Sequence, residues 1–379
     1  MLITIIIFLV VLSIIVFVHE FGHFYTARKL GIGVEEFGFG YPPRMFGIKR
    51  KKIMYSINWI PLGGFVKIKG ESGDHAEDQD SFINQPAWKR ALVLFAGVFM
   101  NWFFAFVLLT IGFIIGLPGA VDSPTDTAGD GAIISNRRVQ IIEVYENSPA
   151  GRENLEIEDI IQSVNNLEFE NAGQMRDYLV ANQESELSFN IRRGKQEIKI
   201  NLTPEEIPEL AQEFEEYKDK KIVGINLIDS GIISYPWYQA PWEGLKTTVN
   251  VTYRILDALY KIIKGGFTGE KIIEISGPVG VAIFSGRAYQ MGFVYLLWFM
   301  ALLSINLAII NILPIPALDG GRLLFLLIEK IRRRPNNQKI EAIIHNIGFT
   351  LLMLLVILIT YKDIVRYGGG LISKITGLF

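Results

Sequence analysis

The stretch HEFGH, at residues 19–23, places two histidines and a glutamate at the end of an apolar run that begins at the first residue. On a helix, residues four positions apart lie on nearly the same face, so His19 and His23 can direct their imidazoles at one ion. Glu20 then lies beside that ion without coordinating it. Two neutral nitrogen ligands and a carboxylate that can take a proton from water are the groups that a zinc hydrolase needs.

The third ligand has to come from elsewhere in the chain. The sequence contains no cysteine, so any metal must be held by His, Asp or Glu. His75 and His345 have no supporting motif, and we predict Asp319 as the third ligand and Zn²⁺ as the cofactor. The same set of two histidines and one aspartate also suits other divalent cations. Satisfied core histidines are the alternative, but ionisable groups inside an apolar span favour a functional interpretation.

Asp319 follows an apolar run, residues 291–318, that is too long for one straight span and contains Pro314 and Pro316. The helix must therefore break before the membrane edge, although this Pro-x-Pro and Asp-Gly-Gly pattern is also an ordinary exit turn. About 17 apolar residues, or roughly 26 Å of helix, precede His19 and place it near the cytoplasmic margin of the membrane. The charge pattern described below puts Asp319 at the same margin, so the three groups can meet.

The composition is that of a membrane protein, because half of the 379 residues are apolar and only 20% are charged. A net charge of −2 gives no basic field for nucleic acid, so we expect no nucleic-acid partner. We predict a polytopic α-helical membrane protein with four transmembrane helices, at about 2–23, 92–117, 291–318 and 343–361. The first could instead be a signal peptide, but it lacks a basic start and a small-residue cleavage site before His19.

The distribution of positive charge predicts the orientation. Eleven lysines and arginines lie in residues 24–90 and six in residues 320–341, whereas residues 118–136 contain none. The positive-inside rule then places the first two of these segments in the cytoplasm and both termini outside. We expect a multi-pass membrane protein whose HEFGH stretch lies near the cytoplasmic face.

Between the spans, the pattern predicts two further folded parts. Residues 31–70 alternate as strands and form either a re-entrant hairpin at the membrane interface or an amphipathic sheet under the membrane. Residues 129–206 contain strand-like segments, a hairpin at Arg193-Gly194-Lys195 and a helix capped by Asn171, in an order that suits an extracytoplasmic PDZ-like α+β domain. The expected domains are thus an N-terminal membrane part (1–128), this module, a linker with an amphipathic helix (207–290) and a C-terminal membrane part (291–379).

Several motifs together resemble the site-2 protease intramembrane metalloproteases, of the bacterial regulator of sigma-E protease type. They are HEFGH, GFG at 38–40, IPLGGFVKIKGE at 60–71, SGPVGVA at 276–282 and LLSINLAIINILPIPALDGGRLLFLLIEKI at 302–331. The resemblance implies that His19, His23 and Asp319 bind zinc, that Glu20 is the general base and that Asn311 helps to hold the substrate. It also implies a PDZ domain that screens substrates, and a location in the bacterial inner (plasma) membrane with the active site near the cytoplasmic face.

The sequence departs from that family in three places. The second span reads AGVFMN at 96–101, where the family usually has Gly-Pro and a small residue before the asparagine, although Asn101 remains. The chain has one PDZ-like module where many relatives have two. Within it, Asn154, Glu158 and Asn166 stand where glycines are usual, and Glu158 is the least compatible with positive φ.

The predicted activity is hydrolysis of peptide bonds in transmembrane segments of single-span membrane proteins, such as anti-sigma factors or remnant signal peptides, within the lipid bilayer. An unwound substrate could add as a strand to the predicted strands, with Gly38, Gly40 and Gly64 allowing close backbone approach and Asn311 bonding its backbone. A plain tight turn is the alternative for Gly38 and Gly40. A divalent-metal transporter and an inactive PDZ scaffold are the alternative functions; the sequence does not predict the oligomeric state.

Overall fold

The computed structural model describes residues 2–71, 75, 77–121, 131–145, 147–194, 196–207, 220–268, 277–334 and 336–376. The chain divides into two compact units. We call Met1–Thr110 together with Pro241–Phe379 the membrane unit, and Ile111–Ala240 the strand-rich unit. Each unit is described separately below.

Four helices of the described chain are long and apolar enough to cross a membrane, which confirms the predicted spans. They are α1 (Leu2–Lys29), α2 (Ala87–Ile115), α8 (Phe293–Ile312) and α10 (Gln338–Thr376). Helices α1, α2 and α10 extend beyond the predicted apolar runs into sequence with charged residues. Charged residues are tolerated at the ends of spanning helices because their long side chains reach the membrane surface. In an apolar 18-residue stretch of each helix, 44% of the stretch is buried in α2 but only 6% in α10. Helix α10 therefore lies at the outside of the unit.

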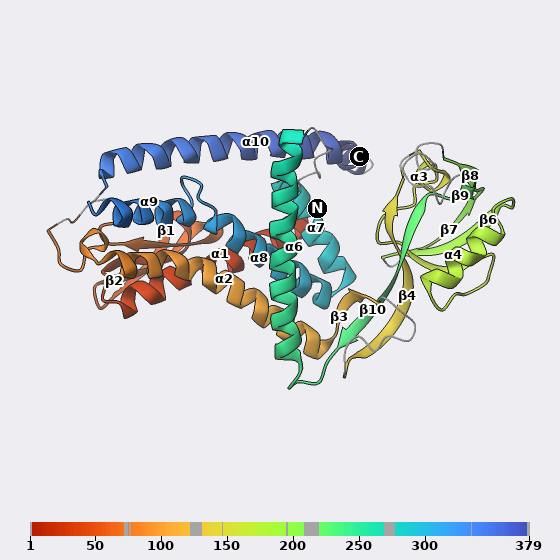
Figure 1. Ribbon diagram of the computed structural model, residues 1–379, viewed down its shortest axis with the longest axis horizontal. Coiled ribbons are helices and arrows are strands. Elements are labelled where there is room, and N and C mark those ends of the chain that lie inside the picture. Colours follow the sequence, from red (N-terminus) through yellow and green to blue (C-terminus); the bar gives the residue numbers. More distant parts are fainter. Residues whose placement is uncertain are drawn as a thin grey trace. The chain divides into compact units, whose positions relative to one another are not determined.

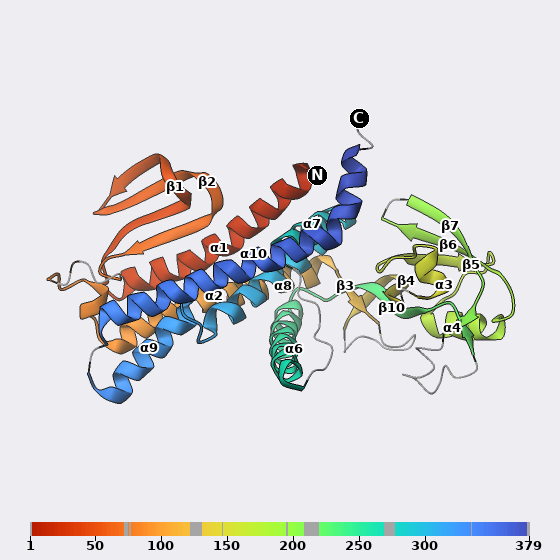
Figure 2. The same cartoon turned by 90° about the horizontal axis from the view of Figure 1, so that it is seen from above.

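The described part of the membrane unit also contains helices α6 (Ala240–Thr268), α7 (Pro278–Met291) and α9 (Asp319–Arg332). Helix α6 is the predicted amphipathic helix, and it runs across the direction of α1, α2 and α8 (Figures 1 and 2). Helix α7 precedes α8, and α9 follows it. The break between α8 and α9 confirms the predicted interruption of the long apolar run, because Leu313, at the end of α8, leaves the helical region with φ −61° and ψ 142°.

The predicted strands of residues 31–70 are present as β1 (Val34–Arg50) and β2 (Ile53–Ile68), with a short 3₁₀ helix η1 (Phe82–Asn84) after them. Both strands bend, so that Glu36 lies opposite Lys67 on one side and Met54 on the other. The result is four antiparallel segments in the order 64–68, 34–39, 53–58 and 44–50. Segment 64–68 is therefore one edge of this sheet.

The strand-rich unit is built on an antiparallel sheet of six strands in the order β3-β10-β4-β5-β6-β7. Its buried core includes Ile141, Leu187, Phe189 and Ile191. The strands are β3 (Leu117–Ala120), β4 (Ile133–Val144), β5 (Ile160–Val164), β6 (Leu187–Arg193), β7 (Gln196–Leu202) and β10 (Ile225–Ser234). The described residues of this unit also form helices α3 (Pro149–Arg152) and α4 (Ala172–Ala181) and the short pair β8 (Glu205–Glu206) and β9 (Lys221–Ile222).

The local predictions for this unit are confirmed except at its C-terminal end. The β6–β7 hairpin turns at Gly194, with Lys195 outside the described residues, and the Asn171 side chain accepts a hydrogen bond from the Gln174 N–H at the start of α4. The assignment of residues 207–290 to a linker and one helix is wrong at β10, which pairs with both β3 and β4. The centre of β10, Asp229-Ser230-Gly231, has a sequence typical of a turn. A register shift between Ser230 and Ile232 accommodates this segment within the sheet.

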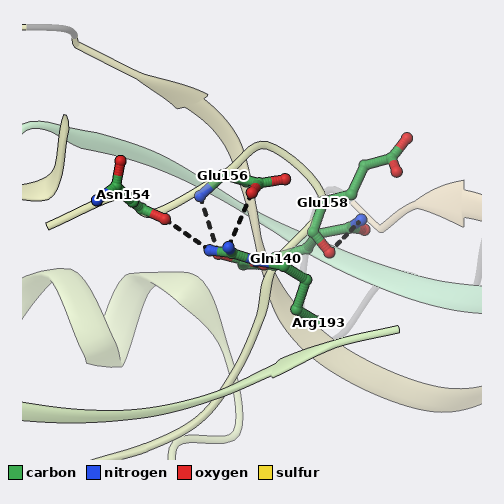
Figure 3. A network of polar contacts seen from close by, with 6 residues as sticks. Gln140, Asn154, Glu156, Glu158 and Arg193 are labelled. Atoms are coloured by element: carbon green, nitrogen blue, oxygen red, sulfur yellow. Dashed lines mark hydrogen bonds and ion pairs between the residues drawn. The ribbon is translucent and has the colours of Figure 1, made fainter. Parts of the chain in front are cut away.

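Three residues that stand where the family usually has glycine adopt the backbone that glycine favours. Asn154 and Glu158, in the loop between α3 and β5, have φ values of 58° and 77°, and Asn166, after β5, has a φ of 64°. Arg193 fixes this loop by bonding both carboxylate oxygens of the buried Asp159 at 2.8 and 2.7 Å and the Asn154 carbonyl at 2.7 Å. The Glu158 carboxylate points away from this network (Figure 3). Glu158 thus adopts a left-handed conformation that a residue with a Cβ disfavours.

Candidate metal centre

The structure brings together His19 and His23 of α1 and Asp319 at the start of α9, more than 290 positions later in the chain. One oxygen of Asp319, Oδ2, lies 3.1 Å from Nε2 of His19 and 3.3 Å from Nε2 of His23. The two Nε2 atoms are 3.2 Å apart. The three donor atoms thus form a nearly equilateral triangle, with both histidines buried and Asp319 partly buried.

This triangle has the dimensions of a zinc site. Ligands about 2.0–2.1 Å from a tetrahedral ion lie about 3.3–3.4 Å from one another. In addition, Oδ2 of Asp319 is buried and has no hydrogen-bond partner among the described residues. Buried carboxylate oxygens are normally satisfied by a partner or a metal. The donor set and its geometry therefore fit zinc with a fourth position left open.

Contacts on the far side of each imidazole determine which nitrogen faces the triangle. Nδ1 of His23 lies 2.8 Å from the Val93 carbonyl, an acceptor, so Nδ1 carries the proton and Nε2 keeps a free lone pair. Nδ1 of His19 lies 3.4 Å from the Asn101 side-chain amide, whose Oδ1 has no partner among the described residues. Exchanging the amide O and N turns Oδ1 toward Nδ1–H and gives His19 the same tautomer.

A glycine on α2 gives the histidines their space. A methyl group at Gly97 would lie 2.8 Å from Cε1 of His19 and still closer to Nε2 of His23. In the sequence, Gly97 lies in the AGVFMN stretch, which was identified only as a departure from a family pattern. The available signal was a glycine within an apolar helix, where it is unfavourable by about 1 kcal/mol relative to alanine and indicates a close approach.

Two more glycines bring Asp319 to the site. A methyl group at Gly320 would collide with the carbonyl oxygens of Ile312 and Leu313, and one at Gly321 with the carbonyl oxygen of Ile315. The start of α9 can therefore fold back tightly against the end of α8 only because both residues lack a side chain. A carboxylate in this position would ligate a metal in its ionised form.

Glu20 is held next to the triangle by the small sheet. Its Oε2 accepts a hydrogen bond of 3.1 Å from the backbone N–H of Val66, on the edge segment 64–68. The loop before that segment is fixed to α1, because Ser13 Oγ donates to the Pro61 carbonyl at 2.7 Å and accepts from the Gly63 N–H at 3.1 Å. The carboxylate therefore lies where helix α1 and a sheet edge meet.

The residues predicted to bind substrate have packing roles in the structure. A methyl group at Gly38 would lie 2.6 Å from Ser56 Oγ, and one at Gly64 would lie 2.9 Å from the Gly38 carbonyl. Gly40 has a φ of +77°, which favours glycine. Asn311 is partly buried, one residue before the end of α8. Their contacts with a substrate stay a prediction.

Most of the chain is similar to a known peptidase family and to several of its relatives. The model of peptidase family M50 matches residues 7–355. The regulator of sigma-W protease RasP of Bacillus subtilis is 29% identical over 96% of this chain and 98% of its own length. The zinc metalloprotease RasP of Shouchella clausii is 29% identical over 95% and 98%, and a relative from Clostridium perfringens is 33% identical over 94% and 97%.

A comparison of structures found PDZ domains. The PDZ domain of an SdrC-like protein from Listeria innocua aligns with 24% of this chain and 92% of its own length, at 18% identity and a TM-score of 0.20.

Proposed function

The chain belongs to peptidase family M50, and on that premise we propose that His19, His23 and Asp319 hold its zinc and that Glu20 is its general base. The protein is thus a zinc-dependent intramembrane metalloprotease. The observation that supports these roles is the triangle of donor atoms, with edges of 3.1, 3.2 and 3.3 Å, with Glu20 adjacent to His19 in the sequence. When bound, zinc supplies a Lewis acid that polarises the scissile carbonyl and lowers the pKa of water.

The protein residues have separate tasks in the proposed hydrolysis. Glu20 takes a proton from the attacking water and later delivers it to the leaving amine. The Val66 N–H keeps one oxygen of Glu20 in place, which leaves the other free for that proton. His19 and His23 stay neutral and ligate through Nε2, while Asn101 and the Val93 carbonyl hold their rings in orientation.

Substrates are proposed to be single-span membrane proteins, of which anti-sigma factors and remnant signal peptides are examples. A transmembrane helix hides its own amides, so the substrate must unwind before cleavage. Segment 64–68 is an edge of the sheet and contacts Glu20, so a substrate added there as a strand lies beside the general base. Gly38, Gly40, Gly64 and Asn311 are proposed to support this backbone contact.

The protein is a multi-pass membrane protein, and we propose the bacterial plasma membrane as its location. The clusters of lysine and arginine support a cytoplasmic position for residues 24–90 and 320–341, and hence for the metal centre. The same rule supports an extracytoplasmic PDZ-like module at 129–206, where it screens substrates by size or sequence.

Replacing Glu20 by Gln tests the proposed chemistry. We expect cleavage of a single-span model substrate by the purified protein in detergent or proteoliposomes to fall by at least about 100-fold, the lower end of what a general base contributes. Zinc content, measured by metal analysis, is expected to stay at the wild-type level, whereas Asp319→Ala is expected to lose both zinc and activity. Unimpaired cleavage by Glu20→Gln would falsify the role of Glu20. A wild-type protein without zinc or cleavage would instead favour a scaffold.

A further inference from the structure

In the loop that carries Asp319, the N–H groups of Leu313, Ile315 and Leu318 bond backbone carbonyls, but the N–H of Ala317 does not. This loop consists of residues 313–318, between the end of α8 and the start of α9, and Pro314 and Pro316 remove two of its N–H donors. At its centre, Ala317 has a φ of +82°, in the left-handed region that a residue with a Cβ disfavours. The Ala317 N–H is thus the point at which a group outside the loop can hold this conformation.

Helix α10 supplies that group. The backbone N–H of Ala317 donates a hydrogen bond of 2.8 Å to Nδ1 of His345, 28 residues later in the chain. The His345 ring is itself held by Phe325 of α9, at a centroid distance of 5.4 Å. The bond requires a neutral imidazole with its proton on Nε2, because only a bare Nδ1 can accept.

A second contact of α10 lies one turn further on. A methyl group at Gly348 would lie 2.6 Å from the Pro316 carbonyl oxygen, so α10 packs directly on the loop at this point. Pro316 and Ala317 are the residues before Leu318 and the metal-facing Asp319. Helix α10 thus fixes the loop by one hydrogen bond and one close backbone contact, immediately before the predicted ligand.

We propose that His345 is a positioning residue of the metal centre. By accepting the Ala317 N–H it keeps the loop in the left-handed conformation that directs the Asp319 carboxylate at His19 and His23. It touches neither the metal nor the substrate and acts through the loop. This inference rests on the proposed role of Asp319 as a zinc ligand.

Three substitutions of His345 separate the acceptor from the ring. His345→Asn keeps an acceptor, Oδ1, at nearly the position of Nδ1. His345→Gln is the matched control with the same amide one methylene further out, and His345→Leu has no acceptor. The readout is the zinc affinity of the purified full-length protein in competition with a chelator. We expect about 10- to 100-fold weaker binding for Leu and Gln, the usual effect of losing a group that orients a ligand, and less than about threefold for Asn.

A fourth variant tests the backbone argument. Ala317→Gly adopts positive φ freely, so adding it to His345→Leu is expected to recover at least about tenfold of the lost zinc affinity. Wild-type affinity in His345→Leu, equal loss in all three His345 variants, or no recovery with Ala317→Gly would each overturn the proposal. If Asp319→Ala binds zinc as tightly as the wild type, the proposed ligand set itself fails. The two failures are therefore distinguishable.

Discussion

Gly97 determines how closely α2 can approach the two histidines of α1. Its missing side chain leaves the space that Nε2 of His23 and Cε1 of His19 occupy. One turn after Gly97, α2 is also bound to α8, because the Ser304 hydroxyl of α8 donates a hydrogen bond of 2.8 Å to the Asn101 carbonyl. The metal centre thus depends on three helices whose contact is made by small side chains, as is common inside membranes.

Replacing Gly97 by Ala is therefore expected to abolish zinc binding without unfolding the protein. The new methyl group overlaps the imidazole of His23, and the rings must turn away from Asp319. Metal analysis of the purified variant is the measurement, with resistance to added protease as the check on folding. Val98→Ala, one residue further along α2, is the control and is expected to keep its zinc. A Gly97→Ala protein with full zinc content would contradict this account of the contact.

At the scale of elements, the strand-rich unit depends on an ion pair that crosses its sheet. Asp159 is 1% exposed and lies immediately before β5, whereas Arg193 is the last residue of β6. The carboxylate also accepts the Glu156 N–H at 2.9 Å, so it closes the loop on both sides. Hydrogen bonds to Asp159 raise the pKa of Arg193 above its ordinary value, so the guanidinium stays charged at all accessible pH.

Arg193→Met is expected to destabilise the strand-rich unit by about 2–3 kcal/mol, because it leaves Asp159 buried without a counter-charge. The value lies below the roughly 3–5 kcal/mol of a fully buried pair because the Arg193 side chain is 29% exposed. Hydrogen exchange of the β5 and β6 amides in the full chain measures the loss. Arg192→Met, on the opposite face of the same strand, is the control. Similar exchange rates in the two variants would show that the ion pair contributes little.

The elements that follow from local pattern could be predicted, and those that need a distant partner could not. The spans, the β6–β7 hairpin and the pairing of His19 with His23 depend on residues within a few positions of each other. Strand β10 was missed because Asp229-Ser230-Gly231 reads as a turn, and only its two neighbouring strands show that the chain continues through it. His345 was set aside for the same reason, since its partner Ala317 has no sequence signal.

At the scale of the whole molecule, the orientation in the membrane rests on charge alone. The two basic segments flank the metal centre in sequence, one after α1 and the other after Asp319. If both face the cytoplasm, peptide bonds are cut near the inner surface, and a substrate can be screened on the outer side before it reaches Glu20. The order of screening and cleavage therefore follows from the topology.

Because the chain has no cysteine, single cysteines can report that topology without background labelling. Lys51 in the β1–β2 turn, Arg333 after α9 and Lys199 on β7 are all exposed. In intact bacterial cells whose outer surface is accessible, a membrane-impermeant maleimide is expected to label Lys199→Cys but neither Lys51→Cys nor Arg333→Cys. After permeabilisation all three are expected to react, which controls for access to the thiol. Labelling of Lys51→Cys from outside would place the metal centre at the opposite face, and cleavage would then have to occur on the outer side of the membrane.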